Sequence, residues 1–332
     1  MPVAAALASG LPLMVGVWFG HFAYGLTASV GGLIFLYMPP TPMHHRMVTL
    51  MTCAFGMNAC FALGLICHFH ASAMVPTLAC IAMLVTMVCR FYGVGMPGSM
   101  FFVMAAAIAA YSPVEMAQLP FMVGLMSLGT VQACLIGFLY SLWTLRERPA
   151  IEVPALPRPS FDFVVLDAVV IGACVGISLL LAHAFSLQKA YWVPVSCLSV
   201  IQGASLRAVW TKPFHRVIGT GLGLILAWGM LSVQASPWMV ALAMMALSFL
   251  IETLVVRNYT LAAIFITPMT ILLAEAASLG QMSPTTLIAA RFFDTLLGCA
   301  VGLAGGICLH NPSFRAALGR QLMRLSPRRF LR

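Results

Sequence analysis

The sequence predicts an all-α integral membrane protein with about twelve transmembrane helices, arranged as two duplicated six-helix halves. Its 332 residues are 62% hydrophobic and only 8% charged, whereas soluble domains contain roughly 45–50% apolar and about 25% charged residues. Apolar runs of about 17–25 residues, long enough to cross a bilayer as helices, recur along the chain. Alternating, strand-like segments do not recur, so the spans are predicted to be helices.

Proline, glycine and charged residues divide the apolar sequence into twelve spans. The first half contains the spans 4–23, 25–38, 47–67, 72–89, 96–111 and 117–143. The second half contains the spans 164–185, 190–204, 216–233, 237–255, 259–277 and 284–308. The count falls to ten or eleven if the short second or eighth segment enters the bilayer without crossing it.

The chain begins with a predicted first helix rather than a signal peptide, because the segment 1–16 contains no Lys or Arg. A proline-rich polar stretch divides the two halves. We therefore predict a first membrane half over 1–145, a cytoplasmic linker over 146–162, a second membrane half over 163–310 and a basic cytoplasmic tail over 311–332.

The two halves match when they are offset by about 165 to 170 residues. His45-Arg46 corresponds to His215-Arg216, and the segment 88–92 (VCRFY) corresponds to 255–259 (VVRNY). The same order of features in each half implies a duplication. Because each unit contains an even number of spans, both copies should enter the membrane from the same side.

The placement of basic residues predicts the orientation, because Lys and Arg are retained in short cytoplasmic loops. Alternate loops hold Arg46, Arg90, Arg146, Arg148, Arg158, Arg207, Lys212, Arg216 and Arg257. The tail adds six more arginines on that side, and only Lys189 and Arg291 fall near the other face. Both ends are therefore expected in the cytoplasm. The net charge of +9 does not indicate nucleic-acid binding, because the bases are not gathered on a soluble domain.

One stretch carries a family resemblance. Residues 190–202 (AYWVPVSCLSVIQ) are followed by Arg207 and then by 215–223 (HRVIGTGLG). They resemble the signature of the fusaric acid resistance and aromatic acid exporter superfamily, and 291–298 (RFFDTLLG) is similar to its last signature helix. The first half shows a weaker similarity, through Thr27-Ala28-Ser29 and Arg46.

The resemblance implies an inner-membrane exporter of aromatic or other small organic acids, driven by the proton gradient and often working with a periplasmic adaptor protein. Larger members of the family also carry a substantial cytoplasmic domain, whereas the linker over 146–162 is short. An anion channel and a non-transporting scaffold subunit of an efflux assembly remain alternative interpretations.

Ionisable residues inside the spans are candidates for function, because burying them in hydrocarbon costs several kcal/mol unless they are paired or hydrated. Asp294 lies inside the last span, and Arg291 three residues earlier shares its helical face. Glu252 lies near the inner end of the tenth span. These three residues are the candidates for transport and proton coupling. A fixed ion pair that only holds helices together is the alternative for Asp294 and Arg291.

Cationic residues that precede two spans are candidates for a vestibule that attracts organic anions, because helix N-termini add partial positive charge. They are Arg46, Arg207, Lys212, His215 and Arg216. Anchoring by the positive-inside rule is the competing interpretation, and it applies to every such loop. Tyr191 and Trp192 are candidates for contact with an aromatic substrate, and anchoring at the membrane interface is the alternative.

The sequence predicts no enzyme, no cofactor and no metal site, because it contains no nucleotide-binding loop, nucleophile motif or paired ligand spacing. The expected partners are the lipid bilayer, a small organic anion and, from the resemblance, an adaptor. Homo-oligomerisation, the substrate and the direction of transport are left open.

Overall fold

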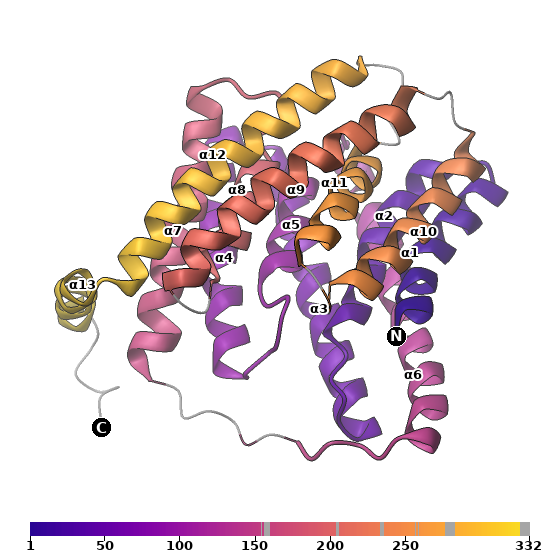
Figure 1. Cartoon of the computed structure of the whole chain (residues 1–332), viewed down its shortest axis with the longest axis horizontal. Helices are drawn as coiled ribbons and strands as arrows, with labels where there is room; N and C mark the ends of the chain where they lie inside the picture. The colour runs from indigo at the N-terminus through magenta and orange to yellow at the C-terminus, as the bar shows by residue number, and fades with distance from the viewer. Residues whose placement is uncertain are drawn as a thin grey trace.

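The protein is an assembly of packed helices in this computed structural model, and no strand occurs among the residues that it describes. These are residues 1–153, 155, 160–203, 206–232, 236–255, 257, 259–275 and 283–325. The long helices α9 and α12 cross the view diagonally, and α13 projects from the left side of the molecule (Figure 1).

The first half contains six α-helices and two 3₁₀ turns in the order expected from the sequence. They are α1 (Pro2–Trp18), α2 (Phe22–Gly32), η1 (Leu33–Tyr37), α3 (Met43–His68), α4 (Ala71–Phe91), α5 (Met100–Ala110), η2 (Met116–Gln118) and α6 (Leu119–Glu147).

The second half follows the linker and begins with a short π-helical turn. Its elements are η3 (Asp162–Leu166), α7 (Asp167–Ala184), α8 (Trp192–Ile201), α9 (Leu206–Ser232), α10 (Pro237–Leu254), α11 (Tyr259–Glu275) and α12 (Pro284–His310), followed by α13 (Pro312–Leu325).

Within the described part of the chain, seven helical segments are long and apolar enough to cross a membrane, and five shorter apolar helices of 10–17 residues lie where the other spans were expected. Serine–proline pairs start two of the long helices. The hydroxyl of Ser236 accepts a hydrogen bond from the Met239 amide, and that of Ser283 accepts one from Thr286. A proline then occupies the first helical position, where its missing N–H costs nothing.

Each half packs through the same kinds of contact. In the first half α2 packs on α1 and α6, while α3 packs on α5 and α6. In the second half α8 packs on α7 and α12, while α9 packs on α11 and α12. The halves meet where α1 packs on α10, where α4 packs on α7 and where α5 packs on α8.

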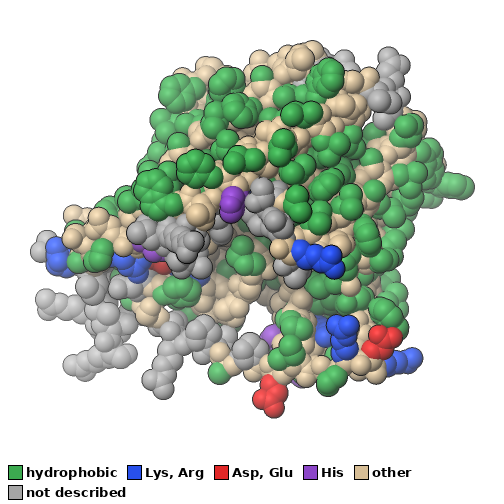
Figure 2. Space-filling model, viewed as in Figure 1, with side chains coloured by type: hydrophobic (Ala, Val, Ile, Leu, Met, Phe, Trp, Pro, Cys, Tyr) green, Lys and Arg blue, Asp and Glu red, His purple; other side chains and the backbone are tan. Residues whose placement is uncertain are grey.

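The outer surface of the bundle is apolar, as a lipid-facing surface must be. Phe55, Trp18 and Ile225 are 77%, 76% and 68% exposed. Figure 2 shows hydrophobic side chains over most of one face, with Lys, Arg, Asp and Glu gathered toward its lower part. A soluble protein would not expose so much apolar surface, so the chain is a multi-pass membrane protein.

The start of α9 and the tail differ from the sequence prediction. Helix α9 begins at Leu206 instead of at 216, because it continues through Pro213; neighbouring helices often stabilise such prolines in membrane proteins. Residues 312–325 of the basic tail, for which no helix was predicted, form α13. Leu318 of α13 packs against a small core that includes Leu166 and Leu309.

Candidate functional site

Helix α8 is the most enclosed of the short helices and connects two polar regions. Apart from the half-buried Ser199, every residue from Trp192 to Ile201 is buried. The ten residues span only about 15 Å as a helix. One polar region lies at its N-terminal end and the other follows its C-terminal end.

The region at the N-terminal end is the aromatic cluster, which we define as Tyr111, His183, Tyr191, Trp192, Arg291 and Asp294. Its residues come from the end of α5, the end of α7, the start of α8 and the body of α12. The cluster therefore draws side chains from both halves of the chain.

Arg291 lies inside the protein, with only 4% of the residue exposed. Its guanidinium carbon lies 3.6 Å from the centre of the Trp192 ring, a cation–π contact whose energy increases when water is excluded. Its Nη2 donates a 3.1 Å hydrogen bond to the Thr270 hydroxyl of α11. Arg291 thus joins α12 to both α8 and α11.

Asp294 is fully buried one helical turn after Arg291. Its carboxylate lies near enough to the Tyr111 hydroxyl to act on it electrostatically. Tyr111 is hydrogen-bonded to Nε2 of His183, and its ring centre is 5.6 Å from that of Tyr191. Arg291 and Asp294 are thus buried, whereas Tyr111 is half-buried and His183 is exposed at the edge of the cluster. A buried charge next to groups that can exchange protons is a candidate for a proton-coupled site.

Small residues on α12 allow this close approach to α8. A Cβ on Gly298 would lie 2.4 Å from the Val193 carbonyl oxygen, and one on Gly302 would lie 2.6 Å from the Cys197 carbonyl oxygen. Only glycine permits such backbone contact, as is common between membrane helices. The cluster is closed in this conformation, since the cavity beside Arg291 and Trp192 measures only about 10 Å³.

The second region, the Arg90 cavity, follows the C-terminal end of α8 and measures about 360 Å³. Its polar lining comes from Arg90, Thr86, Ser99 and Gln202, and its apolar lining includes Phe163. Nε2 of Gln202 donates a 2.6 Å hydrogen bond to the Ser99 hydroxyl, which lies 2.9 Å from that of Thr86. The first half and the second half both line this cavity.

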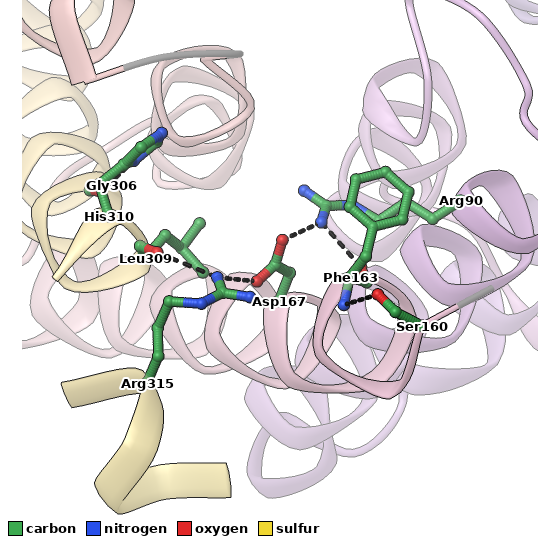
Figure 3. Close-up of polar contacts among 8 residues, drawn as sticks. All are labelled: Arg90, Ser160, Phe163, Asp167, Gly306, Leu309, His310 and Arg315. Carbon is green, nitrogen blue, oxygen red and sulfur yellow. Dashed lines mark hydrogen bonds and ion pairs between the residues drawn. The ribbon is translucent and has the colours of Figure 1, made fainter. Parts of the chain in front are cut away.

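Asp167 at the start of α7 forms ion pairs with two arginines, one of which, Arg90, lines the cavity (Figure 3). One carboxylate oxygen pairs with Arg90 of α4 and the other with Arg315 of α13. Arg90 also donates a 2.9 Å hydrogen bond to the Phe163 carbonyl oxygen, and its guanidinium carbon lies 4.6 Å from the Phe163 ring centre.

The predicted vestibule residues do not gather at one place among the described side chains. Arg46 is buried in the first half, where its Nε donates a 2.6 Å hydrogen bond to the Thr41 carbonyl oxygen and its Nη1 reaches Ser141 of α6. His215 is exposed and Arg216 is half-buried on α9. The side chains of Arg207 and Lys212 lie outside the described part of the chain.

Glu252 has a different environment from Asp294. It lies on α10, which packs against α1. Burial lowers the pKa of the Met1 amino group, and the Glu252 carboxylate partly offsets this effect. The Glu252 carboxylate therefore interacts with the amino group at the start of the chain.

Tyr191 and Trp192 are 7% and 1% exposed. This burial corrects the interpretation of these residues as membrane-interface anchors, because anchors would be exposed to lipid.

Sequence reasoning missed three contributors. Asp167 lies three residues inside the predicted span 164–185, so the rule applied to Asp294 should have selected it as well. Tyr111 and His183 gave no comparable signal, because each lies at the end of an apolar helix and only the tertiary fold brings them together.

Among the described residues, no group of three His, Cys, Asp or Glu side chains forms a metal-binding arrangement.

Apolar helices, a largely lipid-compatible surface and buried charges define a multi-pass helical membrane protein. Within it, residues 170–305 match the family model described as fusaric acid resistance protein-like. The resemblance seen in the sequence is thereby confirmed, and this segment of the chain is similar to the fusaric acid resistance-like family. The matched segment contains Trp192, Arg291 and Asp294.

The chain is also similar to a curated membrane protein. The chain is 22% identical to "Uncharacterized membrane protein YvaC" of Bacillus subtilis (strain 168), in an alignment that covers 92% of this chain and 72% of the relative. The similarity therefore extends into the first half, beyond the family match. No solved structure matches the chain.

Proposed function

We propose that the protein is an inner-membrane transporter that exports aromatic or other small organic acids and is driven by the proton gradient. The observation that carries this proposal is the buried Arg291–Asp294 charge group of α12, in which Arg291 lies against Trp192 of α8. Charges buried at membrane depth are costly, and they commonly mark ion and substrate paths.

The proposal includes a duplicated architecture with twelve spans. Its support is the reciprocal packing of the halves: α1 of the first half packs on α10, the fourth helix of the second half, while α4 packs on α7, the first helix of the second half. Such exchanged pairs are expected of two similar units related by an axis along the membrane normal. Movement of one half against the other would then expose a central site to each side in turn.

The proposal also includes an orientation with both termini in the cytoplasm. The basic residues of alternate loops support it by the positive-inside rule. In that orientation the Arg90 cavity faces the cytoplasm and the aromatic cluster faces the periplasm. The large cavity at the Arg90 end and the closed cluster at the other end then correspond to an inward-facing state.

Proton coupling would act through the charge balance of Arg291 and Asp294. A fully buried carboxylate stays ionised only while nearby positive charge compensates it. A substrate carboxylate that pairs with Arg291 reduces this compensation, so substrate binding and protonation of Asp294 are linked. Trp192 and Tyr191 offer ring surfaces to the body of an aromatic acid. A periplasmic adaptor and a second copy of this chain are partners that the proposal accommodates.

The test is flux in vesicles that contain the purified protein. Export of labelled benzoate and phenylacetate is measured with and without a pH gradient, with protein-free vesicles as the background. We expect flux that depends on the gradient, and we expect Asp294→Asn to lose that dependence. Glu152→Gln is the matched control, because it makes the same change of carboxylate to amide at an exposed residue of the linker.

Other outcomes would favour the alternative functions. Flux that follows the membrane voltage and is unchanged in Asp294→Asn would indicate an anion channel. A folded protein that moves none of several acids would indicate a scaffold subunit. Either result would overturn the proposed proton-driven export.

A further inference from the structure

The Arg90 cavity has the properties of a ligand site that is distinct from the aromatic cluster. Its volume of about 360 Å³ lies within the range of about 300–1,000 Å³ that is usual for small-molecule pockets. It lies between the halves, with α4 and the turn before α5 on one side and Phe163 and Gln202 on the other.

The lining of the cavity matches one class of ligand. Arg90 supplies a positive charge, and Thr86, Ser99 and Gln202 supply hydrogen-bonding groups. The remaining lining includes the apolar residues Val94, Met96 and Phe163. A single cation beside an apolar wall fits an anion that has one charged end and an apolar body.

Asp167 provides an internal competitor for such an anion. Its carboxylate occupies Arg90 in this structure, and Arg315 holds its other oxygen. The Arg90 and Asp167 side chains are 19% and 11% exposed, so water and a small solute can reach the pair. A ligand carboxylate can replace Asp167 on Arg90, while Asp167 keeps its pairing with Arg315.

We propose that the Arg90 cavity is the cytoplasmic binding site for a small aliphatic or aromatic carboxylate, whose charge pairs with Arg90 in exchange for Asp167 and whose apolar body lies against Phe163. The inference rests on the proposed export function for its direction and its orientation. It adds a substrate-binding residue, Arg90, and a competing residue, Asp167, that lie outside the segment matched by the family model.

Equilibrium binding of labelled benzoate to the purified full-length protein tests the proposal without requiring transport. Arg90→Gln should weaken binding by about tenfold or more, because it removes a charge-assisted contact. Asp167→Asn should strengthen binding severalfold, because it removes the competitor. Arg257→Gln is the matched control and should have no effect, since Arg257 is the corresponding arginine of the second half and is exposed.

The opposite changes in benzoate affinity expected for Arg90→Gln and Asp167→Asn distinguish a ligand site from a structural ion pair. If Arg90 and Asp167 only hold α4 to α7, both variants should lose folded protein and benzoate binding together, and the proposal fails. It also fails if Arg90→Gln binds benzoate as the wild type does. Inorganic phosphate and acetate are the competitors: displacement of benzoate by phosphate at equal concentration would overturn the requirement for an apolar body.

The proposed Arg90 site and the proposed export function can be rejected independently of each other. Benzoate binding with the predicted signs, but without any vesicle flux, would uphold the site and reject the export function. Gradient-driven flux with the same apparent KM in wild type and Arg90→Gln would uphold export and reject the Arg90 site.

Discussion

The two ends of α8 carry the same three kinds of residue in different surroundings. At one end Arg291 lies 3.6 Å from the centre of the Trp192 ring, with Asp294 one helical turn away. At the other end Arg90 lies 4.6 Å from the centre of the Phe163 ring and pairs with Asp167. Arg291 and Asp294 are 4% and 0% exposed, whereas Arg90 lines an open cavity of about 360 Å³.

This difference shows that residue types alone do not determine the role of a charged pair. Glycines 298 and 302 bring α12 against the backbone of α8, beside the buried side chains of Arg291 and Trp192. At the other end, the turn before α5 leaves space beside Arg90. The interaction energy of the buried Arg291 and Asp294 changes strongly when a charge is altered, because little water screens these residues. Arg90 and Asp167 are more exposed to water, so Arg90 can exchange Asp167 for another anion.

The largest expected effect comes from separating α12 from α8. Gly298→Val would place side-chain atoms against the Val193 carbonyl oxygen, and we expect a loss of about 3 kcal/mol in stability. Thermal unfolding in detergent measures it. Gly221→Val is the control, because a Cβ on Gly221 has no described atom within 4 Å. Equal losses in the two variants would show that the close packing of α8 and α12 is unimportant.

The next effect concerns the shape of the cation in the closed cluster. Arg291→Lys keeps the positive charge but loses the planar group that lies over Trp192 and reaches Thr270. We expect benzoate flux, as kcat/KM, to fall by roughly tenfold to thirtyfold, which corresponds to about 2 kcal/mol. Normal flux in Arg291→Lys would mean that charge alone suffices at this position.

A smaller effect is expected from the hydroxyl of Tyr111. Tyr111→Phe keeps the ring beside Tyr191 but removes the hydrogen bond to His183. The net value of such a bond is about 1 kcal/mol, so we expect about a fivefold decrease in gradient-dependent flux. Flux without a gradient is the internal comparison. A decrease of the same size in both would indicate a packing role.

The smallest effect is expected at Glu252. Its carboxylate acts on the Met1 amino group in the α1–α10 interface, so Glu252→Gln should change gradient-driven flux by less than about twofold. The measurement is gradient-driven flux in Glu252→Gln, compared with that in Asp294→Asn under the same conditions. Loss of coupling in Glu252→Gln would assign proton transfer to α10 and would reject the contrast between the two carboxylates.

The helices themselves were predictable, because long apolar runs in a membrane permit little other than helix. The predicted span 47–67 became α3 at 43–68, and the predicted span 237–255 became α10 at 237–254. The start of α9 was missed because charge and Pro213 suggested a loop there. The extent of α5 was also overestimated, since the turn from 92 to 99, with its left-handed Gly93 and Gly98, belongs to the cavity wall.

The candidate site was predictable only in part. Asp294 and Arg291 were found because charge within an apolar run is costly and their spacing places them on one helical face. Trp192 was selected only as one of two aromatic residues at the start of a span. The sequence contained no sign that its ring would lie under Arg291, which is 99 positions further along the chain.

The sequence by itself determined the class of protein, the helical nature of its spans, the alternate placement of its basic residues and its family signature. Composition and hydrophobic length decide these properties locally, because the bilayer is their main solvent. Only the tertiary structure decided that α8 is enclosed, that Arg291 lies on Trp192 and that Arg90 shares Asp167 with Arg315. These contacts depend on how helices from different halves approach one another, and that approach is set by side-chain shape and close backbone packing.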